Sequence, residues 1–246
     1  MILKKWEALP EALRTDAVRP YYEAIQKKQF SLLCKRLFDL LVSAVMLLIL
    51  LPVFLILAVA IKLDSPGPVF YRQVRVTQYG RHFRIFKFRS MVANADKIGT
   101  QVTVGNDRRI TRMGKLIRKC RLDELCQLID VFRGTMTFVG TRPEVPKYAD
   151  TYTPEMMATL LLPAGVTSLA SILYKDEDRL LEGAEDVDKT YIQDVLPGKM
   201  RYNLRAVQNF SFWGDIKIMF MTVFAMLGKE YREEADTKNT EKVEMQ

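Results

Sequence analysis

An unbroken apolar stretch at residues 40–61 constrains the fold of this chain more than any other feature. The stretch has no charged side chain, and Ser43 is its one hydroxyl residue. Roughly 20 consecutive apolar residues suffice for a membrane-embedded helix, so the sequence predicts such a segment here. Pro52 lies near its middle, where the missing N–H donor favours a kink.

Basic residues lie on both sides of the stretch. They are Lys27, Lys28, Lys35 and Arg36 before it and Lys62, Arg72, Arg75 and Arg81 after it. Positively charged flanks prefer the cytoplasmic side of a membrane. One straight span cannot place both flanks there, whereas a hairpin that bends at Pro52 can. The residues leave three interpretations open: a re-entrant hairpin, a single span, or a buried core helix, although core helices of this length usually keep a polar face.

Charge and cysteine content narrow the partners and the compartment. The chain has 246 residues and a formal net charge of +8, which suits an anionic partner. Phospholipid is the first expectation beside a membrane segment, and nucleic-acid binding is not expected because no recognised motif accompanies the charge. The 3 cysteines lack C-x-x-C spacing, so we expect reduced thiols and neither a zinc site nor a disulfide framework.

The sequence predicts a mainly helical α+β fold in four parts. Residues 1–34 hold short amphipathic helices that lie on the bilayer, on the main domain or on a second subunit, so a homodimer is possible. Residues 35–63 form the membrane helix, residues 64–228 the main domain, and residues 229–246 a charged tail that we expect to be disordered.

Within the main domain the patterns predict a few local elements. Residues 69–76 and 82–89 alternate as a β-hairpin, and the spacing of apolar residues over 111–133 is typical of one helix. Gly and Pro at 163–167 indicate a turn. The apolar segment before residue 227 fits an amphipathic helix lying in the membrane interface, with a core helix as the alternative.

Asp123 and Glu124 form the strongest chemical signal. An adjacent pair of carboxylates is usually only a solvated helix face, but this pair has many cations in the same domain. Those suited to phosphate oxygens are Lys87, Arg112, Arg118 and Arg142. Two carboxylates can hold Mg²⁺ that also contacts substrate phosphates, and a carboxylate can itself attack phosphorus. Phosphoryl transfer at a membrane surface is therefore one hypothesis.

Several short motifs occur together in a characteristic order. They are Lys35-Arg36-Leu37-Phe38-Asp39, Ser65-Pro66-Gly67-Pro68-Val69-Phe70, Lys87-Phe88-Arg89-Ser90-Met91, Leu122-Asp123-Glu124-Leu125 with Gln127-Leu128, Val139-Gly140 with Arg142-Pro143-Glu144, and Asp215-Ile216-Lys217-Ile218. Each is weak alone. In this order and spacing they resemble the monotopic phosphoglycosyl transferases of the bacterial sugar transferase family, over about residues 35–227.

The resemblance implies a function and a topology. Such an enzyme transfers a sugar-1-phosphate from a UDP-sugar to polyprenyl (undecaprenyl) phosphate, which initiates assembly of a capsule, O-antigen, exopolysaccharide or glycoprotein glycan. It also implies a re-entrant membrane helix kinked at Pro52, a cytosolic catalytic domain with interfacial helices, and a place at the cytoplasmic face of the bacterial inner membrane.

The resemblance also assigns roles to residues. Asp123 is expected to be the nucleophile that forms a phosphosugar–enzyme intermediate, and Asp123 and Glu124 to hold Mg²⁺. The expected phosphate- and nucleotide-binding residues are Lys87, Arg89, Arg112, Arg118 and Arg142.

The chain departs from the family pattern at several positions. They are Leu51 in place of Ser, Arg121 in place of Ser, Cys126 and Thr141 in place of Pro, and the segment 163–168 in place of a basic Pro-Gly-Ile-Thr-Gly. The last change lies in a loop expected near the sugar. The alternative hypothesis is a non-enzymatic adapter with a single membrane span and a basic module that binds lipid or a partner.

Overall fold

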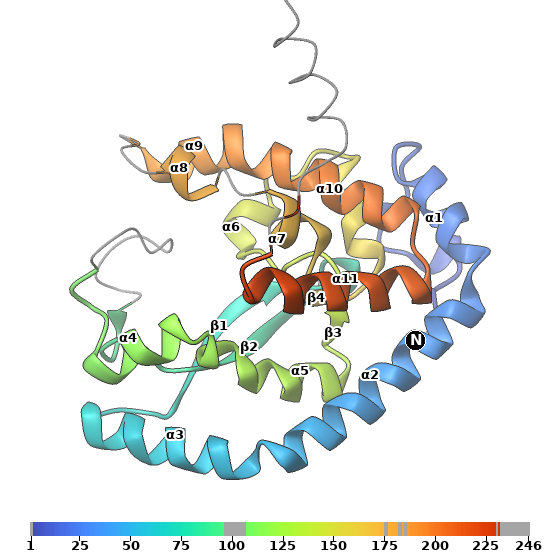
Figure 1. The fold of residues 1–246 in the computed structure, drawn as a ribbon. Helices are drawn as coiled ribbons and strands as arrows, with labels where there is room; N and C mark the ends of the chain where they lie inside the picture. The colour runs from blue at the N-terminus through green and yellow to red at the C-terminus, as the bar shows by residue number, and fades with distance from the viewer. Residues whose placement is uncertain are drawn as a thin grey trace, which may run out of the picture.

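The chain folds into a mainly helical molecule with two small sheets (Figure 1). The computed structural model describes residues 2–95, 107–174, 177–181, 184, 186–229 and 231. The α-helices are α1 (Arg19–Gln26), α2 (Gln29–Ile49), α3 (Leu51–Asp64), α4 (Arg112–Lys119), α5 (Leu128–Arg133), α6 (Pro146–Ala149), α7 (Leu169–Leu173), α8 (Glu177–Leu181), α9 (Val187–Thr190), α10 (Leu196–Gln208) and α11 (Phe212–Met226). The strands are β1 (Phe70–Val76), β2 (His82–Phe88), β3 (Met136–Val139) and β4 (Ala164–Thr167).

Short helical turns complete the chain. The 3₁₀ turns are η1 (Trp6–Ala8), η2 (Glu11–Leu13), η3 (Gln78–Gly80), η5 (Leu122–Gln127) and η6 (Met156–Leu161), and η7 (Tyr191–Val195) is a π-helical turn. The mainly helical fold with a small β-hairpin is as predicted. Most of the expected tail at 229–246 lies outside the described residues.

Helices α2 and α3 form a bent arm along one side of the molecule (Figure 1). The bend is 60° and falls where Pro52, at the start of α3, has no N–H to donate. The predicted kink is confirmed. Among the described residues no single helix has the length and apolarity needed to cross a bilayer, whereas the two helices of the arm meet that requirement when taken together.

The inner face of α2 carries a buried polar stripe. The Lys35 ammonium donates to the Val139 carbonyl at 2.7 Å and pairs with Asp215 of α11 at 2.5 Å. One turn on, the Asp39 carboxylate accepts from the Thr137 hydroxyl at 2.6 Å. Residues four apart share one face of a helix, so this stripe fastens α2 to β3 and α11.

The outer face of the arm is apolar and exposed. On α2 it consists of Leu33, Leu37, Leu41, Val45, Leu48 and Ile49, and on α3 of Leu51, Leu55, Ile56, Val59 and Leu63. An apolar patch of this extent marks a contact surface for a membrane or a protein. Helix α11 also exposes large apolar side chains, among them Trp213 and Phe220, as the interfacial interpretation of this segment requires.

The β1–β2 hairpin is antiparallel and pairs Phe70 with Phe88 and Val76 with His82. Ile85 is buried on one face against α5 and β3, and Phe88 on the other against α3 and α4. Strand β2 also packs against η5, which places Lys87 next to that helical turn.

Strands β3 and β4 are parallel neighbours, so the predicted turn at 163–167 is wrong. The glycine responsible is Gly165, where an added Cβ would lie 2.2 Å from the Gly140 nitrogen. Gly165 permits a close approach of two backbones here and does not reverse the chain.

The single helix predicted at 111–133 is also wrong. It is divided into α4, η5 and α5, because Arg121 adopts a left-handed conformation with φ of 55°. Non-glycine residues adopt this conformation rarely. The break turns the chain so that Asp123 and Glu124 begin a separate short helix.

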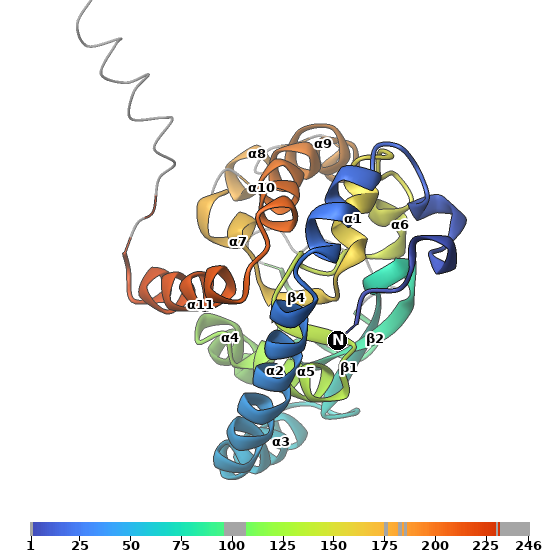
Figure 2. The same ribbon diagram turned by 90° about the vertical axis from the view of Figure 1, so that its right-hand side faces the viewer.

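The N-terminal residues pack on the main domain (Figure 2). Leu3, Leu13 and Ile25 are buried in one cluster with Leu161 of η6 and Phe210, which follows α10. Of the placements left open by the sequence, contact with the main domain is the one observed. A homodimer stays a prediction.

Candidate functional site

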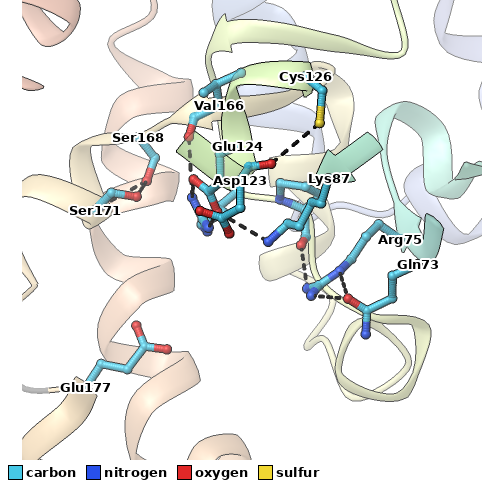
Figure 3. A network of polar contacts seen from close by, with 12 residues as sticks. Gln73, Arg75, Lys87, Asp123, Glu124, Cys126, Val166, Ser168, Ser171 and Glu177 are labelled. Atoms are coloured by element: carbon cyan, nitrogen blue, oxygen red, sulfur yellow. Dashed lines mark hydrogen bonds and ion pairs between the residues drawn. The ribbon is translucent and has the colours of Figure 1, made fainter. Parts of the chain in front are cut away.

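The candidate site forms where the first turn of η5 meets β2. Asp123 and Glu124 come from η5, and Lys87 comes from the end of β2 (Figure 3). Arg142 comes from the loop after β3. The left-handed Arg121 and the packing of η5 on β2 place the two carboxylates among cations from separate parts of the sequence.

Glu124 is engaged by two cations. Its Oε1 accepts from the Lys87 ammonium at 3.3 Å and from Arg142 Nη2, and its Oε2 accepts from Arg142 Nη1 at 3.2 Å. Burial alone would raise the pKa of Glu124, but Arg142 and Lys87 outweigh it and hold this pKa at about 2. Glu124 is therefore ionised at neutral pH and holds the two cations in place.

Asp123 has a different environment. Burial raises the pKa of its carboxyl, and the negative charge of Glu124 raises it further, against the opposing effects of Lys87 and Arg118. Its backbone carbonyl accepts from the Cys126 thiol at 3.5 Å. A partly desolvated carboxylate beside cations is a stronger nucleophile than one in water.

A cavity of about 590 Å³ opens beside Asp123. The charged residues that line it are Arg72, Arg75, Lys87, Arg89, Arg109, Arg118 and Asp123, and Pro68, Phe70 and Met91 contribute apolar surface. Within the described residues Arg109 is paired with Asp107 at 2.6 Å. Cations outnumber carboxylates in this lining, so the cavity favours an anionic ligand.

The structure brings most of the predicted site residues together. Lys87, Arg118 and Asp123 line the cavity, and Glu124 and Arg142 lie behind them. Arg112 is exposed at the start of α4 and does not line the cavity.

Arg89 lines the cavity but is occupied by the end of α3. Arg89 is 5% exposed, and its guanidinium donates to the carbonyls of Ser65 at 2.6 Å and of Pro66 at 3.0 Å. A further bond of 3.3 Å goes to the Ile61 carbonyl in the last turn of α3, so Arg89 caps the C-terminus of that helix. Phosphate binding by Arg89 and Arg112 stays a prediction.

Several residues of the cavity wall were missed in the sequence, among them Arg72, Gln73, Arg75 and Arg109. Gln73 and Arg75 of β1 lie beside Lys87 (Figure 3). The alternation along β1 could have indicated Gln73 and Arg75, because both share one face with Tyr71. Arg72 lies on the other, more exposed face and lines the cavity as well, so alternation alone would not have identified every cavity residue.

The carboxylates can be tested for a fit to Mg²⁺. Within the described residues no group of three or more His, Cys, Asp or Glu side chains could hold a metal ion. Both oxygens of Glu124 are engaged by cations, which leaves Asp123 as the available carboxylate. Mg²⁺ is often bound by one or two carboxylates together with substrate phosphates, so Asp123 fits and Glu124 does not in this arrangement.

Comparison with known proteins identifies the family. The family described as bacterial sugar transferase matches residues 30–229, and the chain belongs to it. A similar protein is UDP-N-acetylgalactosamine-undecaprenyl-phosphate N-acetylgalactosaminephosphotransferase of Aeromonas hydrophila, 37% identical over 196 residues, or 78% of this chain and 43% of that protein. Another is UDP-glucose:undecaprenyl-phosphate glucose-1-phosphate transferase of Escherichia coli (strain K12), 36% identical over 197 residues, with 78% of this chain and 40% of that protein covered.

Length differs among the relatives. The chain spans about two fifths of the two proteins just described, at 43% and 40%. It covers 96% of the exopolysaccharide production protein PSS of Rhizobium leguminosarum bv. phaseoli, which is 36% identical over 207 residues, or 80% of this chain. The matched region includes the bent arm, the hairpin and the carboxylate pair.

Proposed function

We propose that this protein is a phosphoglycosyl transferase that moves a sugar-1-phosphate from a UDP-sugar to polyprenyl phosphate. The observation that carries the proposal is Asp123, which faces a cation-lined cavity while Glu124 holds Lys87 and Arg142 beside it. Both substrates present phosphates, for which such a cavity is suited. The names of the relatives support the same donor and acceptor classes.

The proposed reaction has two steps. A carboxylate oxygen of Asp123 attacks the sugar-bearing phosphorus, the bond from that phosphorus to the bridging oxygen breaks, and UMP leaves with the bonding electrons. An oxygen of polyprenyl phosphate then attacks the same phosphorus, and the bond to Asp123 breaks to restore the carboxylate. Lys87 and Arg118 offset the charge on the transferred group, and Glu124 keeps Lys87 and Arg142 in position.

Mg²⁺ is the proposed cofactor. It would be held by Asp123 together with phosphate oxygens, and it would supply a positive charge that offsets the negative charge of the diphosphate.

We further propose that the enzyme works at the cytoplasmic face of the bacterial inner membrane. The exposed apolar faces of α2, α3 and α11 suit contact with the bilayer. Lysines precede and end the bent arm, and a re-entrant hairpin would keep both ends on the positively charged, cytoplasmic side.

The test is to incubate the purified protein in lipid with polyprenyl phosphate, Mg²⁺ and a panel of UDP-sugars. We expect UMP, and not UDP, to be released with a matching amount of lipid-linked sugar. Asp123→Asn removes the nucleophilic oxygen, so turnover should fall by at least about 10³-fold while membrane association is kept.

Asp16→Asn is the matched control, because Asp16 is an exposed aspartate of the N-terminal segment, and it should retain full activity. Turnover by Asp123→Asn would remove the nucleophile assignment. Release of UDP, or of no nucleotide by the wild-type protein with any donor, would contradict the proposed reaction.

A further inference from the structure

Arg75 is a cation in the cavity wall for which the proposed roles above give no use. It lies on β1 one residue before the last residue of the strand, on the face that points into the cavity. Lys87 and Arg142 are both paired with Glu124. Among the described residues, Arg75 has no carboxylate within ion-pair distance.

The guanidinium of Arg75 is held in a fixed orientation by neutral oxygens. Its Nε and Nη2 both donate to Gln73 Oε1, at 3.1 Å and 2.6 Å, and its Nη1 donates to the Pro143 carbonyl at 3.0 Å. A guanidinium has five N–H donors, of which these bonds use three. Two remain for a ligand, and the head group is already oriented.

The charges around Arg75 show that positive charge is in excess. Burial lowers the pKa of Arg75, and Arg142 lowers it further against the opposing charge of Glu144. Glu144 is itself satisfied, since it accepts from Tyr191 at 2.7 Å and lies 3.7 Å from Lys199. Three cations, Arg75, Lys87 and Arg142, thus lie near two carboxylates, Asp123 and Glu124, and the ion pairs of Glu124 are with Lys87 and Arg142. Such a cluster is stabilised when an anion binds.

The arrangement of the elements gives the order of the groups. Strand β2, which carries Lys87, pairs with β1, which carries Arg75, and packs against η5, which carries Asp123. Lys87 is therefore the common neighbour of Arg75 and Asp123, and all three residues line the cavity. The phosphorus that Asp123 attacks must lie next to Asp123, so Arg75 is placed for the other phosphate of a diphosphate.

We propose that Arg75, oriented by Gln73, binds the nucleoside-side phosphate of the donor and stabilises it as the nucleotide leaves. The inference rests on the proposed function. In the first step the electrons of the broken bond move to the oxygen of that phosphate, so negative charge grows there. A fixed guanidinium at that point would favour departure of the nucleotide.

The experiment measures binding of UDP, UMP and uridine to the full chain in lipid, with Mg²⁺ present. Arg75→Gln should weaken UDP and UMP about tenfold or more, the loss expected for charge-assisted hydrogen bonds. Uridine binding should not change, because uridine has no phosphate. Arg75→Lys keeps the charge and should recover part of the loss.

Gln73→Glu tests the same role with Arg75 intact. The new carboxylate would pair with Arg75, so UDP and UMP should again weaken and uridine should not. This variant also covers the case in which Arg75→Gln does not fold. Arg84→Gln is the control, because Arg84 is exposed on β2 of the same hairpin and does not line the cavity.

Unchanged UDP and UMP binding in Arg75→Gln or Gln73→Glu would overturn the inference. An equal loss for uridine would also overturn it, because Arg75 would then act only by holding the Pro143 loop. A wild-type protein that binds UDP but releases no UMP from any UDP-sugar contradicts the proposed function instead, and phosphate binding by Arg75 is still measured by the UDP comparison.

Discussion

At the scale of single residues, two adjacent carboxylates have opposite properties. Asp123 is partly desolvated and its pKa is raised, whereas Glu124 is held ionised by two cations. The difference comes from their neighbours, since the two residues are consecutive in the sequence. A raised pKa keeps Asp123 reactive, and a lowered one makes Glu124 a fixed countercharge for Lys87 and Arg142.

Glu124→Gln should destabilise the fold, because Lys87 and Arg142 lose their shared countercharge. We expect a loss of about 1–3 kcal/mol at neutral pH, measured by thermal unfolding in detergent. The folded-state pKa of Glu124 is lowered from 4.5 to about 2, so its contribution is present above 4.5 and is lost as the pH falls through that window.

The difference in stability between the wild-type protein and Glu124→Gln should therefore shrink as the pH falls from about 5 to about 2. Glu11→Gln is the control, since Glu11 is exposed in the N-terminal segment, and it should change little at either pH. A difference that stays constant across this range would contradict the assigned ion pairs.

At the scale of elements, buried polar contacts hold α2 to the domain. Lys35 is 3% exposed, and its pair with Asp215 joins α2 to α11. Asp39, one turn along, is 1% exposed and accepts from Thr137 of β3. Charged side chains at such positions are tolerated because each has a partner.

Lys35→Met should destabilise the protein by about 3–5 kcal/mol, because it leaves Asp215 buried without a countercharge. The double variant Lys35→Met with Asp215→Leu should regain most of that loss, since it replaces the pair with apolar side chains. Thermal unfolding measures both. Lys62→Met, at an exposed lysine of α3, is the control. Equal instability of the single and double variants would show that the pair is not the cause.

The elements also show how far the sequence was informative. The apolar run, the proline and the alternation at 69–89 correctly predicted the bent arm and the hairpin, because local periodicity decides them. The segment 163–167 was mistaken for a turn, since Gly165 is needed for contact with a strand distant in sequence. No local signal marked the break at Arg121, where a non-glycine residue is left-handed.

The candidate site was predictable only in part, because local sequence does not show which side chains meet after folding. Asp123, Glu124 and Lys87 are found by motif and resemblance, and the structure brings them together. Arg89 has the same chemistry, but its guanidinium is used by the end of α3. Both Arg75 and Arg89 line the cavity, and tertiary packing decides that Arg89 is bonded to the end of α3, so composition alone could not separate the two.

At the scale of the whole molecule, the proposed topology places both ends of the chain on one side of the membrane. Single cysteines at positions 11 and 229, introduced where Cys34, Cys120 and Cys126 have been replaced, should both resist an impermeant maleimide in intact spheroplasts. Both should react after lysis. Labelling of one end alone in intact cells would favour the single-span adapter.

The substitution Pro52→Ala tests the same topology by changing the bend. It restores an N–H donor at the bend, so α2 and α3 could continue as one helix with the length to cross a bilayer. We expect a fraction of this variant to expose one end to the maleimide. The effect should be absent in Leu51→Ala, which leaves the proline in place.

Both ends of the bent arm are fastened to the same folded body. At its start Lys28 donates to the Phe210 carbonyl at 2.6 Å and Arg36 to the Val131 carbonyl at 2.8 Å. At its end Arg89 donates to the Ile61 carbonyl in the last turn of α3 at 3.3 Å and to the Ser65 carbonyl just after it at 2.6 Å. Opening the angle would have to break both attachments at once. A bilayer that takes up this arm would thus receive a preformed wedge, whose depth is set by the protein's own architecture and not by lipid thickness.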